Sequence, residues 1–392
     1  KMKKKLIVFY FKIQVFFFTI FNFLFRIIYK QKNTTVIGVE EIASFLSNIK
    51  KVIPFSVNVN FNFNKFYNYS YDYDLSAIKP RVFKGIYSAI LLAYLSSKHK
   101  NFIYISGAGF FISDVDGRET EFRLLKSKGC NVLCFYTGSD IRSFLLMDKF
   151  SHENEIDVIT TYQRISHKNI DSKENEAKRK MLAIASEKYA DAIFNPNIDQ
   201  MSYFKRPTHS ILYFVEKNQI REYPDKFSNN EIVKIVHAPS SPIIKGTPLV
   251  RAAIKKLKEE GYIFNYVELI DKPNKVVLEE LSTAHIVLNE FYAFVPGVFG
   301  IEAMANNAVL LTSADKNIEP SLQGEANEAW VVTPYWLVYD KLKEQLDKTM
   351  LELKEQADKG TEWVKKYCTE EYSAKYLNNV INEITNCATQ LD

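Results

Sequence analysis

The chain has 392 residues, of which 47 % are hydrophobic and only 13 are glycine and 12 proline; this excludes a disordered or fibrous protein and allows two domains with separate cores. The net charge is +5, but residues 1–32 hold eight lysines and arginines and no acidic residue, whereas the rest of the chain has 43 basic and 46 acidic residues. The basic excess is therefore local, and a general nucleic-acid-binding surface is excluded.

The cysteines indicate neither a disulfide framework nor a metal site. Cys130, Cys134, Cys368 and Cys387 lack the spacing of metal ligands. Cys130 and Cys134 lie on one expected strand, where residues i and i+4 share a face but are too far apart to bridge. We expect free thiols in a reducing compartment.

The first expected element is an apolar helix from Leu6 to Tyr29, whose 24 residues would measure about 36 Å and could cross a bilayer. At about 100° per residue its polar side chains form one stripe. They are Lys5, Lys12, Thr19, Asn22, Arg26 and Lys30, and only Gln14 lies well off the stripe. A basic stripe on an apolar helix is typical of a helix in the membrane interface, where lysines meet anionic headgroups.

Three alternatives to an interfacial helix are open for this segment. A spanning signal anchor is possible, although two internal charges make it costly. A cleaved signal peptide is disfavoured because no small-residue cleavage site follows the apolar run. The segment from Lys5 to Phe11 could instead be the first buried strand of an α/β domain.

Beyond residue 33, short apolar runs alternate with helical patterns, which predicts parallel sheets covered by helices. The expected strands of the first half are 36–39, 56–60, 102–106, 131–136, 157–160 and 192–195, and its helices are 40–48, 82–96, 117–128 and 174–190. The segment 206–230 contains Pro207 and Pro224 and is expected to leave the first domain. A second series follows, with strands at 233–237, 264–269, 286–289, 308–312 and 329–332, helices at 247–260, 275–281 and 301–306, and two terminal helices at 337–359 and 361–385. We expect two domains, residues 33–228 and 229–364.

The first candidate site follows the expected strand 233–237, where residues 237–247 read HAPSSPIIKGT. Ligands of open α/β sheets bind at such strand-to-helix turns. Lys245 would offer a cation to a diphosphate, Gly246 would allow close approach of the backbone, and Ser240 lies in the same turn. A lysine in a solvated loop is the alternative.

The second candidate site is residues 297–310, GVFGIEAMANNAVL, which read as a loop of Gly297, Val298 and Phe299, a short helix with Glu302 in its first turn, and a buried strand. Exposed backbone, a helix N-terminus and a carboxylate suit a phosphate beside a ribose. The alternative is a glutamate that only favours its own helix dipole. Both turns should emerge at one edge of the second sheet, so that Lys245 meets phosphate while Glu302 accepts hydrogen bonds from ribose hydroxyls.

Two turns of the first domain are further candidates. Residues 136–142 (YTGSDIR) place Asp140 and Arg142 at a strand end, either as a pair that holds the loop or as catalytic and acceptor-binding groups in a cleft. Residues 106–111 (SGAGFF) place Gly107 and Gly109 at another strand end, without the third glycine of a dinucleotide fingerprint. His152 is a second candidate for a catalytic residue lining the cleft.

The motifs HAPSSPIIKGT, ASEKYADAIF (185–194) and GVFGIEAMA (297–305) resemble GT-B glycosyltransferases, especially the retaining glycosyltransferase 4-like group. VIGVEEI (36–42) and GSDIR (138–142) resemble members that build capsule, lipopolysaccharide or other cell-surface glycans. The resemblance implies two Rossmann-like domains facing a cleft, with a last helix (365–392) returning to the first domain.

The same resemblance implies a function. A sugar would move from a uridine- or guanosine-diphosphate donor to a lipid-linked or surface-glycan acceptor, at the cytoplasmic face of the inner membrane. Lys245 would neutralise the diphosphate, Glu302 would bind the ribose, the backbone of residues 297–299 would approach the sugar and phosphate, and neither a metal nor another cofactor would be needed.

The chain departs from the group at two places. An arginine five or six residues before the lysine is replaced by Ser240 or Pro239, and a glutamate eight residues before Glu302, which lies near the transferred sugar in the family, is replaced by Phe294. Glu290, four residues before Phe294, could compensate for this loss, or a loop at the strand end could leave it exposed. Two alternative functions therefore stay open: a catalytically silent homologue that binds a nucleotide sugar or scaffolds glycan assembly, and a polyol-phosphate transferase of wall-polymer synthesis.

Overall fold

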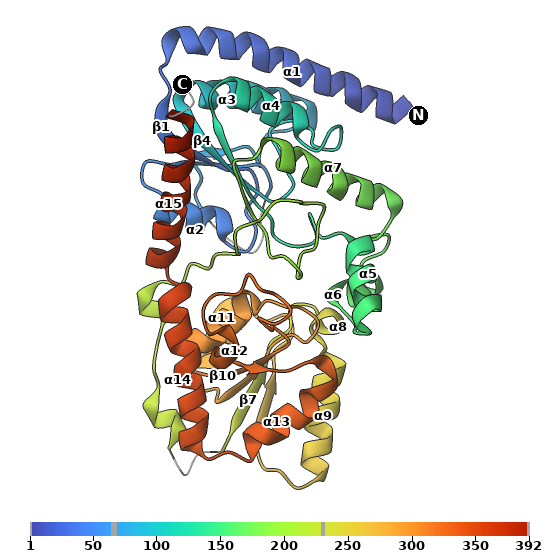
Figure 1. The fold of residues 1–392 in the computed structure, drawn as a ribbon, viewed down its shortest axis with the longest axis vertical. Coiled ribbons are helices and arrows are strands. Elements are labelled where there is room, and N and C mark those ends of the chain that lie inside the picture. Colours follow the sequence, from blue (N-terminus) through green and yellow to red (C-terminus); the bar gives the residue numbers. More distant parts are fainter. Residues whose placement is uncertain (1, 64–68, 229–231, 390–392) are drawn as a thin grey trace.

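The computed structural model describes residues 2–63, 69–228 and 232–389, which form two α/β domains stacked along the long axis of the molecule (Figure 1). The first domain has a parallel sheet of order β3-β2-β1-β4-β5-β6. Its strands are β1 (Lys32–Gly38), β2 (Val57–Asn60), β3 (Tyr73–Asp74), β4 (His99–Ile105), β5 (Asn131–Phe135) and β6 (Ala192–Phe194). This is the doubly wound Rossmann order, in which the strand sequence reverses between β1 and β4.

The second domain has a parallel sheet of order β11-β10-β9-β7-β8. Its strands are β7 (Lys234–His237), β8 (Asn265–Glu268), β9 (Ile286–Leu288), β10 (Val309–Thr312) and β11 (Val331–Val332). The order reverses between β7 and β9, and His237 pairs with Leu288 where both strands end. The turns after these two strands therefore emerge side by side at the place where such sheets bind ligands.

Helices cover both faces of each sheet, so the strands are buried on both sides and read as apolar runs. In the first domain α3 (Arg81–Lys98), α4 (Glu119–Ser127) and α7 (Lys173–Tyr189) pack on one face, and α2 (Phe45–Val52) and α15 (Glu370–Thr389) on the other. Alternation within β4 serves both cores, because Phe102 and Tyr104 face the first helix layer while Ile103 and Ile105 face the second.

The second sheet is covered in the same way. Helices α9 (Thr247–Glu259) and α13 (Val338–Leu346) pack on one face, α10 (Asn274–Ser282) and α11 (Gly297–Ala305) pack on the other, and α14 (Met350–Tyr367) contributes to both cores. The short helices α8 (Pro242–Lys245) and α12 (Ala326–Ala329) complete this domain, and α5 (Phe144–Asn154) and α6 (Ile159–Ser166) lie on the side of the first domain that faces it (Figure 1).

The chain crosses between the domains twice, and the two crossings pair. Val215 donates its N–H to the carbonyl of Cys368 at 2.8 Å and accepts from the N–H of Glu370 at 3.1 Å. The last helix α15 then packs on the first domain, as the GT-B resemblance implies (Figure 1). This two-stranded crossing is the connection about which the domains would have to hinge.

The N-terminal segment forms one long helix, α1 (Met2–Ile28), and not a strand at Lys5–Phe11. It runs alongside α3, in the same direction, at the end of the first domain away from the second (Figure 1). Asn22, expected on the solvated stripe, is instead buried, and its Nδ2 donates to the carbonyl of Ala93 at 3.0 Å and to Oγ of Ser96 at 2.9 Å. The predicted solvated stripe is wrong at Asn22, because α3 supplies partners for its amide nitrogen that the sequence of the helix alone does not reveal.

Two expected elements differ in the structure. Residues 157–160 are not a strand, because Val158 is the N-cap of α6 and the apolar run continues into a helical pattern. A run of four apolar residues does not distinguish a strand from a helix start. The loop expected at 297–299 is the first turn of α11. Glu302 consequently lies in the second turn, which corrects its expected place in the first.

Candidate functional site

The turns after β7 and β9 bring a buried glutamate onto the predicted donor lysine. Lys245 ends α8, and Gly246, with φ +80°, turns the chain into α9. Glu290 comes two residues after β9, and its Oε2 accepts a hydrogen bond from Nζ of Lys245. The glutamate side chain is 5 % exposed and the lysine side chain 25 % exposed. Lys245 is thus held at the reversal point of the second sheet rather than in a solvated loop.

The second carboxylate oxygen of Glu290 lies against the start of α11. Gly297 has φ +64°, and a Cβ on it would be 2.9 Å from Oε1 of Glu290. A side chain at position 297 would displace the end of the Glu290 side chain and would also be strained by the positive φ. Pro296 is the N-cap residue of this helix, and its side chain makes no capping hydrogen bond to the first N–H groups. These N–H groups carry the positive end of the helix dipole, so Glu290 places its negative charge between a lysine and a helix N-terminus.

The protonation of Glu290 reflects these opposing influences. Burial raises the pKa of its carboxyl group, and Lys245 acts in the opposite direction. Asp199 raises this pKa further and Arg142 lowers it. The Glu290 carboxylate therefore contacts the same two features that an anionic ligand would use, namely a cation and the N-terminus of a helix.

Glu302 lies on α11 about 7.5 Å along the helix axis from Gly297, given a rise of about 1.5 Å per residue. It is half-buried, burial raises the pKa of its carboxyl group, and its Oε1 accepts a hydrogen bond from Nδ2 of Asn274 at 3.1 Å. A carboxylate has about four acceptor positions. Capacity therefore remains for a vicinal pair of hydroxyl groups, as the ribose prediction requires.

His237 organises the same edge without being exposed. Its Nδ1 lies 2.7 Å from the carbonyl oxygen of Leu288 and its Nε2 lies 2.9 Å from Oγ1 of Thr247. Burial lowers its pKa to about 4. The ring is therefore neutral near pH 7 and ties the end of β7 to β9 and to the start of α9.

Arg142 is placed at the contact between the domains. Its Nη2 lies 2.8 Å from Oδ2 of Asp199, and the side chains are 5 % and 3 % exposed. Oδ1 of Asp199 accepts from the N–H of Phe294 at 2.7 Å, a residue of the second domain. The pair expected with Asp140 is thus formed with Asp199, and the role of Arg142 in acceptor binding stays a prediction.

A second carboxylate reinforces the domain contact. Glu319 is fully buried and accepts hydrogen bonds from the N–H groups of Asn197, Ile198 and Asp199 at 3.0, 2.6 and 2.8 Å. Neither Asp199 nor Glu319 carried a signal in the sequence. Their partners in the other domain lie 95 to 122 residues away, so no local spacing could have revealed them.

The reversal point of the first sheet faces the second domain with its own polar groups. Glu40 follows β1, Ser106 follows β4 and Asp140 follows β5. Glu40 accepts hydrogen bonds from Nδ2 of Asn62, at 2.6 Å, and from Ser106. Burial raises the pKa of Glu40, and the charge of Asp140 raises it further. The structure thus adds Glu40, which lies within VIGVEEI, to the predicted Asp140.

The remaining candidates have simpler surroundings. A Cβ on Gly109 would lie 2.7 Å from Oε2 of Glu121, a buried carboxylate, so this glycine serves packing. A Cβ on Gly107 would lie 2.9 Å from Leu182. His152 is exposed in the last turn of α5, and within the described ranges no side-chain hydrogen bond or ion pair joins it to the other candidates. Its catalytic role stays a prediction.

Three donor-side candidates lie around the pair of Lys245 and Glu290. Ser240 is exposed in the turn before α8, and Val298, in the first turn of α11, is 45 % exposed. Phe299 is half-buried and packs on the core of the second domain. Ser240 and Val298 are accessible to a ligand, whereas Phe299 mainly anchors α11.

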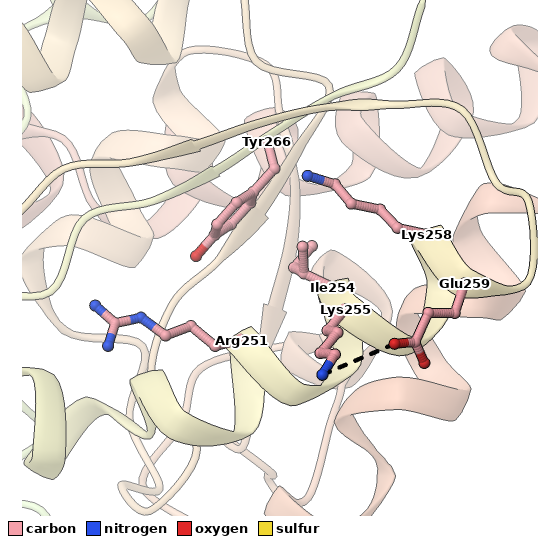
Figure 2. Close-up of a pocket in the computed structure, with 6 residues that line it drawn as sticks. All are labelled: Arg251, Ile254, Lys255, Lys258, Glu259 and Tyr266. Carbon is pink, nitrogen blue, oxygen red and sulfur yellow. Dashed lines mark ion pairs between the residues drawn. The ribbon is translucent and has the colours of Figure 1, made fainter.

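A hollow of about 390 Å³ lies elsewhere on the second domain (Figure 2). Its lining residues are Arg251, Ile254, Lys255, Lys258 and Glu259 of α9 and Tyr266 of β8. Lys255 is paired with Glu259 at 3.8 Å, and Arg251 is paired with Glu268. The hollow contains none of the predicted site residues and lies on the side of a helix rather than at the strand ends.

No protein-family model and no curated protein matches the sequence. Among solved structures, the chain is similar to sucrose-phosphate synthase from Thermosynechococcus elongatus, with a TM-score of 0.59, 11 % identity, and 91 % of this chain and 100 % of that chain covered. It is also similar to an α-glucosyltransferase in complex with UDP-glucose and DNA containing an abasic site, with a TM-score of 0.52, 11 % identity, and 89 % and 99 % covered. The chain has the GT-B fold, two Rossmann-like domains joined by paired crossings.

Proposed function

We propose that the chain is a glycosyltransferase that moves a sugar from a nucleotide-diphosphate donor to a glycan acceptor. The observation that carries this proposal is the position of the Glu290 carboxylate between Lys245 and the N-terminus of α11. This is a site for an anion, at the reversal point of a parallel sheet, occupied by an internal anion. A donor diphosphate would replace Glu290 there while Glu302 binds the ribose.

The chemistry follows from the same groups. In the transfer, the acceptor hydroxyl oxygen forms a bond to the anomeric carbon, the bond from that carbon to the diphosphate oxygen breaks, and the hydroxyl proton is released. Negative charge develops on the departing diphosphate. Lys245 and the N–H groups of α11 would stabilise this charge where it develops, without a metal ion. We propose retention of the anomeric configuration, as the resemblance to the glycosyltransferase 4-like group implies.

The acceptor would bind at the reversal point of the first sheet, near Glu40, Ser106 and Asp140. Carboxylates and hydroxyls there suit sugar hydroxyl groups, and closure of the two domains would exclude water. We propose a lipid-linked or surface glycan as the acceptor, and the cytoplasmic face of the membrane as the location. The donor would be a uridine- or guanosine-diphosphate sugar, in keeping with the UDP-glucose named for one protein of similar fold.

One observation favours a second candidate, a catalytically silent nucleotide-sugar-binding protein. Phe294, which replaces the family's first glutamate, is 4 % exposed and packs edge-on against Phe150, with ring centroids 5.8 Å apart. It cannot contact a sugar as a carboxylate would. Glu290 would have to supply that contact after it leaves the diphosphate position. A polyol-phosphate transferase, the third alternative, gains no specific support from these contacts.

Calorimetry with UDP and GDP, followed by assays of nucleoside-diphosphate release from a panel of donor sugars, tests the proposal. We expect one nucleotide to bind, and Lys245→Ala to weaken its binding by about tenfold or more, since a charge-assisted contact contributes about 1.5–3 kcal/mol. The matched control is Lys255→Ala, which removes a lysine of the same domain outside the site. Binding without turnover would leave the silent homologue, and no effect of Lys245→Ala would reject the site.

A further inference from the structure

The outer face of α1 is an exposed apolar surface of the first domain. Its large apolar side chains are 41–71 % exposed. They are Leu6, Val8, Phe9, Phe16, Ile20, Phe23, Leu24, Ile27 and Ile28. At 100° per residue, Phe9, Phe16, Ile20, Phe23 and Ile27 point in one direction, opposite to the buried Phe11 and Phe18. Contiguous apolar surface of this extent marks an interaction site.

Polar contacts fix how α1 is turned about its axis. Gln14 donates to the carbonyl of Gly85 at 2.9 Å and accepts from the N–H of Ile112 at 3.0 Å. Asn22 is bound to α3, as described above, and Arg26 donates to the carbonyl of Lys128 at 3.1 Å. With its inner face held by these contacts, α1 has only its outer face free for another partner.

From these contacts we infer that the outer face of α1 binds the surface of an anionic lipid bilayer, with α1 parallel to the membrane plane and still packed on α3. The basic residues support this occupant. Lys5 and Lys12 lie on one flank of the apolar face, Lys30 follows the end of the helix, and all three are exposed. Their stems can lie along the apolar boundary while their ammonium groups reach anionic headgroups.

Charge also distinguishes the bilayer from a second copy of this chain. Residues 1–32 contain eight basic residues and no acidic one. Pairing two such faces would bring like charges together, whereas an anionic bilayer neutralises them. The bilayer is therefore the occupant with matching chemistry.

A membrane-spanning α1 fits the contacts less well. The segment Lys5–Ile28 is long and apolar enough to cross a membrane. To do so it would have to leave α3, which would break the hydrogen bonds of Gln14 and Asn22 and uncover Phe111, whose ring packs edge-on against Phe11 and Phe18. Docking by the outer face keeps all of these contacts.

The inference deepens the proposed function, since it gives the transferase a defined side towards a membrane-borne acceptor. Because α1 lies at the end of the molecule away from the second domain (Figure 1), docking would leave the donor side in the aqueous phase. Soluble nucleotide sugars would then reach it freely.

The test is sedimentation of the full-length protein with preformed vesicles of phosphatidylcholine alone or with about 30 % phosphatidylglycerol. We expect co-sedimentation with the anionic vesicles, weakened by about 0.5 M salt because the headgroup attraction is screened. The triple variant Phe9→Asn, Phe23→Asn, Ile27→Asn should lower the bound fraction on the order of tenfold. Its matched control replaces three residues of similar exposure elsewhere, Ile165→Asn, Ile263→Asn and Leu351→Asn, and should bind as the unchanged protein does.

Substitution is preferable to deletion of residues 1–32, because deletion would uncover the core beneath α1. Circular dichroism and thermal unfolding check that the triple variant is folded. UDP binding by calorimetry then reports on the proposed donor site independently of the membrane. Equal binding to both vesicle types, or by the triple variant and the unchanged protein, would overturn the inference. So would a stable dimer in light scattering that the triple substitution dissolves. Bound protein that a chase with excess vesicles at high salt fails to release would indicate a span instead.

Discussion

The substitution Glu290→Gln should tighten the binding of UDP. In the structure the Glu290 carboxylate pairs with Lys245 and lies against Gly297 at the start of α11. A diphosphate that enters must displace this carboxylate and remain near it. Glutamine has nearly the same shape but no charge, so Lys245 becomes available and the repulsion disappears.

The magnitude follows from Coulomb's law. Two unit charges about 4 Å apart interact by about 1 kcal/mol in water and about 4 kcal/mol at the effective dielectric near a protein surface. The repulsion in the complex is smaller than this value, because the displaced carboxylate can turn towards solvent. A net gain of about 1.4 kcal/mol corresponds to tenfold tighter binding, which calorimetry resolves readily.

Protonation of Glu290 should mimic the substitution. Burial raises its pKa, and a bound diphosphate would raise it further. The complex therefore takes up a proton, and UDP binding should strengthen as the pH falls from about 8 towards about 5.5. The Glu290→Gln variant should retain only the pH dependence of the phosphate itself.

Comparison of UDP with the productive donor sugar adds a second readout. If Glu290 contacts the sugar after it leaves the diphosphate position, Glu290→Gln should improve UDP binding but reduce turnover. Unchanged or weaker UDP binding by the variant at pH 8 would refute the view that Glu290 occupies the diphosphate position.

Three other substitutions test separate contacts. Glu302→Gln should weaken UDP binding by about tenfold, since hydrogen bonds to charged groups contribute about 1.5–3 kcal/mol. It should also abolish the preference for UDP over 2′-deoxy-UDP. A retained preference would reject the ribose role of Glu302. Gly297→Ala should lower the free energy of unfolding by about 1–3 kcal/mol because of the positive φ alone, and by more because the new Cβ would contact Glu290. The control is Gly261→Ala, which is also at positive φ but has nothing within 4 Å of its Cβ, and it should show only the backbone effect. Arg142→Met should cost about 3–5 kcal/mol in urea unfolding, because it leaves the buried charge of Asp199 without its partner; a loss below about 1 kcal/mol, as for an exposed pair, would contradict that account.

The fold was largely predictable because its signals are local. Buried strands such as β5 and β9 are apolar runs that end at polar turns, and α9 and α14 have clear amphipathic patterns. The positions of Lys245 and Glu302 follow from the same pattern, since residues that follow parallel strands gather at one edge of a sheet.

Other features depend on contacts that no local pattern encodes. The spacing places Asn22 on a solvated stripe, but in the structure its amide nitrogen donates hydrogen bonds to α3, more than seventy residues away. Arg142 looked like a partner of Asp140, two residues before it, but the fold supplies Asp199 instead. In both cases tertiary packing, and not the local sequence, determines which group the polar side chain contacts.

The position of Glu290 connects the proposed donor site to the domain contact. The loop that follows it carries Phe294, whose N–H is held by Asp199, and Asp199 is held in turn by Arg142 of the first domain. A diphosphate that displaces the Glu290 side chain would act at the start of this loop, and only three residues lie between Glu290 and Phe294. The same loop, in which Phe294 stands where the glycosyltransferase 4-like group has a glutamate, thus joins the proposed diphosphate position to the first domain. Donor binding and closure of the two domains would then be coupled through the backbone of residues 290–294, without any contact between the donor and the first domain.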